Sequence, residues 1–150
     1  MRVCDIILKI DKKQIGSVAI GNATNSEYSH TAVLTELNEV IEAEFPRVIK
    51  TDFEKWKRNN SHREYYFSKW YDSHIDVYSY VGKWYETGRF VNFGFYRVFT
   101  WLKLNIVADW FINRDNSKKV VCTELNGLCR GLPNPHKLEP KDFVKFIEKT

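Results

Sequence analysis

Cysteine is scarce in this sequence, with three residues among 150. An odd and low number of thiols does not build a disulfide framework, so reduced thiols fit better. Long apolar runs are also missing, because amide and charged side chains interrupt even the most apolar region, Phe90 to Ile112. We therefore expect no bilayer-spanning helix. Charges lie in and just after the first apolar stretch, so no signal peptide fits, and a cytoplasmic location is expected.

Strong net charge is lacking too, since the formal charge is only +4. Such a mild balance does not point to a specific nucleic-acid or membrane partner. The chain has no Gly-rich phosphate loop. Cys122, Cys129 and His136 are irregularly spaced and have no fourth ligand nearby, which argues against a zinc site. We expect no metal and no other cofactor.

The composition is otherwise that of an ordinary globular protein, with 43% apolar and 28% charged residues. No linker divides the chain, so a single domain over residues 1–150 is predicted. Aromatic residues make up 15% and gather between Trp56 and Phe111. Most of them are expected in the core, although exposed Trp and Tyr side chains would also suit a partner-binding surface.

The apolar pattern predicts strands at Cys4–Ile10, His30–Thr35 and Val40–Glu44, the last two forming a hairpin that turns within Glu36–Glu39. Alternation also predicts a strand at Ile75–Val81. Helical turns are expected at Thr51–Trp56, capped by Thr51, and in part of Phe93–Ile112. A helix from Cys122 should stop at Gly131, and a short amphipathic helix is expected at Lys141–Lys149. The segment Gln14–Gly21 fits a helix or a strand.

Cys122 is the candidate nucleophile. The β-branched pair Val120-Val121 leads into it, and Leu125, Leu128 and Cys129 follow at helical spacing. The first turn of a helix has unpaired N–H groups and the positive end of the macrodipole, which favour a thiolate. The alternative is that Cys122 serves only as a small buried hydrophobic residue. We interpret Cys129 as a buried core thiol.

His30 is the candidate base. It opens a strand, and the acidic residues Glu42 and Glu44 share one face of the returning strand. Pairing centred on Glu36 puts Glu42 opposite His30, whereas pairing centred on Leu37 puts Glu44 there and Glu42 on the diagonal. Either carboxylate would orient the imidazole and stabilise its charge. A plain surface ion pair is the alternative, and His62 is interpreted as solvated.

Four segments in this order resemble a known family. They are the strand CDIIL from Cys4, ATNSEYSH ending at His30, VIEA from Val40 with Glu42 twelve residues after His30, and VCTEL around Cys122. Together they resemble the circularly permuted branch of the NlpC-type papain-like fold, the YiiX-type amidase group. The Pro-containing segment 138–143 is also similar, whereas the middle of the chain, about 57–118, does not match in detail.

The resemblance implies an α+β papain-like fold with a small antiparallel sheet against the helix that carries Cys122. It implies Cys122 as nucleophile, His30 as base and Glu42 as the third member, with Glu44 as its alternative, and Tyr28 lining the site. The chain departs from the family at Cys4 (usually Gly) and Thr123 (usually Ser), which leaves the substrate class open.

These residues predict a thiol-dependent hydrolase that cleaves an amide, ester or thioester through a thioacyl intermediate. The family suggests peptide, peptidoglycan-type or acyl-conjugate substrates. A cell-wall substrate would require delivery by another route, because no export signal is recognised. An acyltransferase, or a non-catalytic member of the fold that binds a partner protein or lipid through the aromatic middle region, remains the alternative. The oligomeric state is not readable from the sequence.

Overall fold

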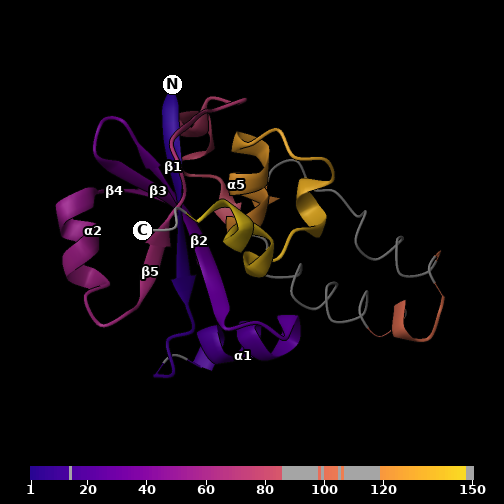
Figure 1. The fold of residues 1–150 in the computed structure, drawn as a ribbon. Coiled ribbons are helices and arrows are strands. Elements are labelled where there is room, and N and C mark those ends of the chain that lie inside the picture. Colours follow the sequence, from indigo (N-terminus) through magenta and orange to yellow (C-terminus); the bar gives the residue numbers. More distant parts are fainter. Residues whose placement is uncertain (14, 86–97, 99, 105, 107–118, 148–150) are drawn as a thin grey trace.

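One sheet with helices on both faces forms the framework (Figure 1). The computed structural model describes residues 1–13, 15–85, 98, 100–104, 106 and 119–147. Neighbouring strands are antiparallel, apart from the parallel pair β7 and β8, so the predicted α+β class with an antiparallel sheet is confirmed. The elements are β1 Arg2–Lys9, α1 Ile15–Thr24, β2 Tyr28–Thr35, β3 Glu39–Glu44, β4 Arg47–Asp52, α2 Phe53–Asn59, β5 Tyr65–Phe67, β6 Tyr71–Asp72, η1 Val77–Tyr80, β7 Trp84–Tyr85, β8 Lys119–Val120, α5 Cys122–Cys129, η2 Pro135–Lys137 and η3 Pro140–Phe146.

The sheet order is β5-β1-β2-β3-β4-β7-β8, with β6 also paired to β1. The predicted hairpin is confirmed as β2 and β3, and the ambiguous segment after residue 14 forms helix α1. Helix α5 ends as predicted, because Gly131 has a positive φ of 63° and the Leu132 N–H donates to the Gly127 carbonyl at 2.9 Å. The amphipathic segment near the C-terminus is present as the 3-10 helix η3.

Two local predictions are wrong. The segment Ile75–Val81 forms the 3-10 helix η1 rather than a strand, because the Asp76 side chain accepts the Tyr78 N–H at 3.1 Å and begins a helical turn. The helix after β4 is capped by Asp52, not Thr51: Asp52 Oδ1 accepts the Lys55 N–H at 3.0 Å, whereas Thr51 pairs with Val40 in the sheet. The expected helix within 93–112 lies mostly outside the described residues.

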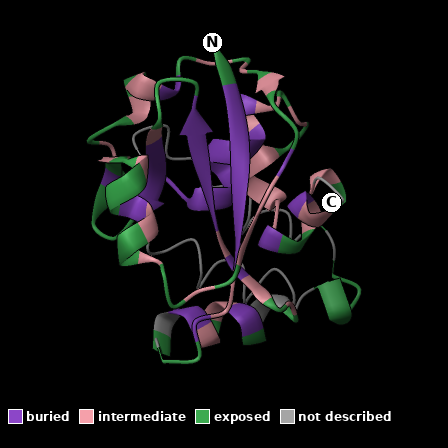
Figure 2. Ribbon diagram, turned by 60° about the vertical axis from the view of Figure 1, so that its left-hand side comes forward, coloured by how far each residue is buried: buried purple, intermediate pink, exposed green. Residues whose placement is uncertain are grey.

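The alternation of side chains along the strands divides the core into two clusters, one on each face of the sheet. On one face, Val33 of β2 and Ile41 of β3 pack with Leu125 of α5. On the other, Leu34 of β2 packs with Trp56 of α2. Figure 1 shows α2 and α5 on opposite sides of the strands, and Figure 2 shows that the central strands are buried. In the described residues no helix is both long enough and apolar enough to cross a bilayer.

A buried carboxylate on β1 holds α5 against the sheet. Asp5 has no exposed surface, and its Oδ1 accepts from Asn126 Nδ2 at 2.7 Å and from the Tyr71 hydroxyl at 2.7 Å. Its Oδ2 forms an ion pair with Arg130 Nε, one residue after α5. Asn126 Nδ2 also donates to the Ala32 carbonyl of β2 at 2.9 Å. Burial raises the pKa of Asp5, and the Arg130 charge opposes that rise.

We expect Asp5→Ala to lower the free energy of unfolding by about 3–5 kcal/mol, because it leaves Arg130 and Asn126 buried without their partner. Urea denaturation monitored by circular dichroism measures this change. The exposed Asp72 on β6 is the matched control, and Asp72→Ala should stay within about 0.5 kcal/mol of the wild type. Equal effects of the two substitutions would show that Asp5 does not anchor α5.

Candidate active site

Cys122 is the first residue of α5, and Val121 before it is extended. The side chain is buried, with 5% of the residue exposed. Its sulfur accepts hydrogen bonds from the backbone N–H groups of Thr31 and Thr123. The N–H of a first helical residue has no acceptor within the helix, so the backbone at Cys122 offers a donor beside its own thiol.

His30 joins the Cys122 thiol to a carboxylate. Its Nε2 lies 2.9 Å from Glu42 Oε2, and its side chain also hydrogen-bonds Cys122. Because Nε2 is engaged by Glu42, Nδ1 is the nitrogen left for the thiol. The imidazole retains 17% exposure and the Glu42 side chain 9%. Cys122 thus contacts His30, and His30 contacts Glu42, so the three residues proposed from the sequence form one chain of hydrogen bonds.

The contact between Cys122 and His30 crosses from one face of the sheet to the other. Cys122 belongs to the cluster on the α5 face, whereas His30 alternates with Ala32 and Leu34, which face α2. The β2–β3 ladder has only two residue pairs, Val33–Ile41 and Leu34–Val40. Beyond them, Thr31 donates its N–H to the Cys122 sulfur. The α5 terminus therefore meets His30 where the ladder stops.

The register of the hairpin corresponds to pairing centred on Leu37, which puts Glu44 nominally opposite His30. Nevertheless the side chain that bonds His30 is the diagonal one, Glu42. Trp56 gives the reason, because its indole Nε1–H donates to Glu42 Oε1 at 3.0 Å and holds the carboxylate by its other oxygen. Glu44 is an exposed residue, but desolvation of its carboxyl group beside the cleft, together with the charge of Glu42, raises its pKa.

Electrostatics favours an ion pair of thiolate and imidazolium. Burial alone would raise the pKa of Cys122, but the His30 charge and the hydrogen bonds to the sulfur lower it below the usual value. Burial alone would lower the pKa of His30, but Cys122 and Glu42 together raise it above the usual value. Burial raises the pKa of Cys4 to about 11 and that of Cys129 to about 12. Cys122 is thus the thiol with a lowered pKa among the three.

A cleft of about 430 Å³ opens over His30 and Glu42. Its walls come from α1, from β3 and β4, and from the segment 59–63, which begins at the last residue of α2. Tyr85 also lines it. Cys122 is not among the lining residues, but its hydrogen-bond partner His30 is, so the thiol lies behind the imidazole at this cleft. His30 and Glu42, two of the three predicted site residues, line this cavity, whereas the contributions of Trp56 and Arg63 had no recognisable sequence signal.

The other candidate residues lie elsewhere or have other contacts. Tyr28 is not among the residues that line the cleft; its ring packs edge-on against Tyr66, with centroids 6.3 Å apart. His62 is exposed, as expected, but it is not only solvated, because its Nε2 lies 3.0 Å from Asp11 Oδ2 and it lines the cleft. Cys129 is fully buried in the core, as expected.

Comparison with known proteins identifies no relative: neither family models, nor curated proteins, nor solved structures give a match to this chain. Within the described residues, no group of three His, Cys, Asp or Glu side chains is arranged to hold a metal ion.

We expect the rate of Cys122 alkylation by iodoacetamide to titrate well below the free-thiol pKa of about 8.5, because His30 stabilises the thiolate. In His30→Ala the midpoint should move up, to about 8.5 or above, since the imidazolium charge is lost and only the two backbone hydrogen bonds then oppose burial. Cys4 and Cys129 stay protonated near pH 6 because their pKa values are raised, so the alkylation measured there is that of Cys122. Mass spectrometry of the labelled peptides reports the site. The same midpoint in both proteins would contradict the ion pair.

Proposed function

We propose that this chain is a cysteine hydrolase that cleaves an amide, ester or thioester bond, with Cys122, His30 and Glu42 as its catalytic residues. One observation carries the proposal: a single imidazole joins a thiol of lowered pKa to a carboxylate at the edge of a cleft. This is the arrangement of nucleophile, base and orienting group that covalent acyl transfer requires.

In the proposed reaction, the Cys122 thiolate attacks the acyl carbon and forms a tetrahedral oxyanion. The oxyanion collapses to a thioester with Cys122, and the leaving amine, alcohol or thiol takes its proton from the His30 imidazolium. Neutral His30 then removes a proton from water, whose oxygen attacks the thioester carbon. The carboxylic acid product leaves, and the proton on His30 balances the regenerated thiolate.

Two surrounding groups fit roles in this reaction. The backbone N–H of Cys122, at the start of α5, is the candidate donor to the oxyanion. Glu42 keeps the imidazole oriented, and Trp56 keeps Glu42 oriented through the second oxygen. Trp56 is therefore a positioning residue, because it acts on the imidazole through Glu42.

The likeness to the permuted NlpC-type papain-like fold supports the same function. It rests on the chain order His30, Glu42, Cys122, on the hairpin that carries the first two, and on a helix that begins at the third. Peptide, peptidoglycan-type and acyl-conjugate substrates follow from that resemblance, and so does the permuted papain-like architecture. A cytoplasmic location remains part of the proposal.

Mixing the protein with p-nitrophenyl butyrate should give a burst of nitrophenol close to one equivalent and an intact mass raised by one butyryl group. We expect Cys122→Ala to abolish both signals and Cys129→Ala to retain them, because Cys129 is a buried core thiol. Added glycine amide separates transfer from hydrolysis, since an acyltransferase would release the butyryl amide. Turnover that persists in Cys122→Ala would refute the proposal.

The two glutamates provide a matched pair. Glu42→Gln should lower kcat/KM by about 10- to 100-fold, the usual worth of a hydrogen bond to a charged group. Glu44→Gln should stay within about twofold, because Glu44 has no bond to His30 among the described contacts. Steady-state hydrolysis of the same ester measures both. The reverse order would make Glu44 the third member.

A further inference from the structure

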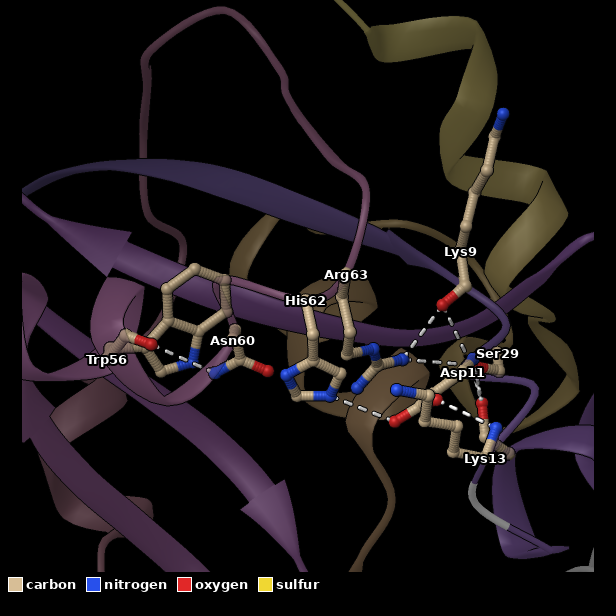
Figure 3. A network of polar contacts seen from close by, with 9 residues as sticks. Lys9, Asp11, Lys13, Ser29, Trp56, Asn60, His62 and Arg63 are labelled. Carbon is tan, nitrogen blue, oxygen red and sulfur yellow. Dashed lines mark hydrogen bonds and ion pairs between the residues drawn. The ribbon is translucent and has the colours of Figure 1, made fainter.

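Arg63 lines the same cleft and is held there by neutral groups. It follows α2, and its Nη2 donates to the Lys9 carbonyl at 2.9 Å and to Ser29 Oγ at 3.1 Å (Figure 3). These two contacts fix the guanidinium next to the strand that carries His30. The Nε atom is buried and has no hydrogen-bond partner. In the described part of the chain, no carboxylate lies within ion-pair distance of Arg63.

Two of the three carboxylates whose charges act on Arg63 are occupied elsewhere, and the third, Glu44, lines the same cleft beyond ion-pair distance. Asp11 accepts the Lys13 N–H at 2.9 Å and binds His62, as Figure 3 shows. Glu42 is held by His30 and Trp56. Burial is the main influence on the pKa of Arg63 and lowers it, so the acids nearby do not compensate for its desolvation. A half-buried cation without an ion-pair partner in the described part of the chain has an energetic cost that a bound anion would offset.

The position of Arg63 relates it to the reacting groups. The charge of Cys122 acts on Arg63, and the charges of His30 and Arg63 both act on Glu44. Apolar side chains line another wall of the cleft, among them Phe45, which is 71% exposed, and Ile49. The cleft thus combines an apolar wall from the β3–β4 hairpin with a cationic wall from the segment 59–63.

We propose that Arg63 binds an anionic group, a carboxylate or a phosphate, on the substrate of the Cys122 site. The substrate class is then an acyl donor with a negative charge close to its scissile bond and an apolar part against Phe45 and Ile49. This inference rests on the proposed hydrolase function only in that it calls the bound molecule a substrate. The anion site itself rests on Arg63, which lines the cleft and has no carboxylate within ion-pair distance among the described residues. A planar guanidinium binds both oxyanions well, so both belong to the same chemistry.

A binding experiment tests the site without catalysis. Isothermal titration of the full-length Cys122→Ala protein with inorganic phosphate, and separately with succinate, should show saturable binding of at least one of the two. Arg63→Gln should weaken that binding by about 10- to 100-fold. Arg58→Gln is the matched control, because Arg58 is an exposed arginine on α2 five residues earlier, and it should bind like the parent protein. Tighter binding of phosphate or of succinate identifies the source of the anion.

A kinetic experiment tests the substrate class. Wild-type kcat/KM should be about tenfold or more higher for p-nitrophenyl hemisuccinate than for the neutral p-nitrophenyl butyrate if the anion is a carboxylate, and phosphate should compete with the ester if it is a phosphate. Arg63→Gln should abolish the preference or the competition, whereas Arg63→Lys should restore part of it. Because the wild-type comparison needs no variant, misfolding of Arg63→Gln would not hide the answer.

The two proposals fail differently. If no ester is turned over but phosphate or succinate binds through Arg63, the hydrolase proposal fails and the anion site stands. If the neutral ester is hydrolysed through Cys122 and neither anion binds or competes, the hydrolase stands and the role of Arg63 is refuted. Equal weakening by Arg58→Gln would also refute it, because that result would reflect net charge alone.

Discussion

The buried charge of Asp5 is the constraint on which the site depends. Cys122 and His30 are 92 positions apart, and the helix that carries Cys122 must be placed within hydrogen-bond distance of the second strand. Apolar packing of a short helix leaves its rotation and its shift along the sheet weakly determined. Asp5 removes this freedom, because Asn126 and Arg130 reach the same carboxylate from one side of α5 and from its end. A buried carboxylate tolerates few other arrangements, since each would leave charges unpaired.

The site itself lies where the sheet is interrupted. An uninterrupted β2–β3 ladder would bond the Thr31 N–H to β3 and would close the gap between the two faces. Because the ladder has only two pairs, this N–H stabilises the Cys122 sulfur instead, and the thiol of one face meets the imidazole of the other. The short β2–β3 ladder thus lets Cys122 contact His30, and it also makes the Thr31 N–H available to stabilise the thiolate.

The second constraint is that both oxygens of the Glu42 carboxylate are hydrogen-bonded. Glu42 is bound by His30 on one side and by Trp56 on the other, so the side chain cannot turn away from the imidazole. Trp56 is also the largest residue of the α2-face cluster, where its ring stacks near Phe53 and meets Tyr65 edge-on. The orientation of the imidazole is therefore coupled to the packing of α2, an element with no reactive residue of its own.

Much of this arrangement is local and was predictable from the sequence. The hairpin follows from alternating apolar residues around a polar turn, and the helix from Cys122 follows from its spacing and from Gly131. These patterns are local because one or two turns of chain determine the backbone conformation. The nomination of Cys122 and His30 also required only residue chemistry and chain order, whereas the preference for Glu42 over Glu44 came from the family resemblance. The strand expected at Ile75–Val81 failed because one local side-chain bond, from Asp76, outweighed the alternation.

Only the tertiary structure decided which glutamate meets His30 and what else faces the cleft. Strand register favoured Glu44, and the bond from Trp56, fourteen residues away, selected Glu42. Likewise, nothing near Arg63 in the sequence indicates that its guanidinium is fixed by Lys9 and Ser29. Such contacts join residues far apart in the chain, and their geometry depends on how whole elements pack. Sequence periodicity therefore determined most of the elements, and residue chemistry nominated Cys122 and His30 as candidates, whereas long-range packing determined their partners.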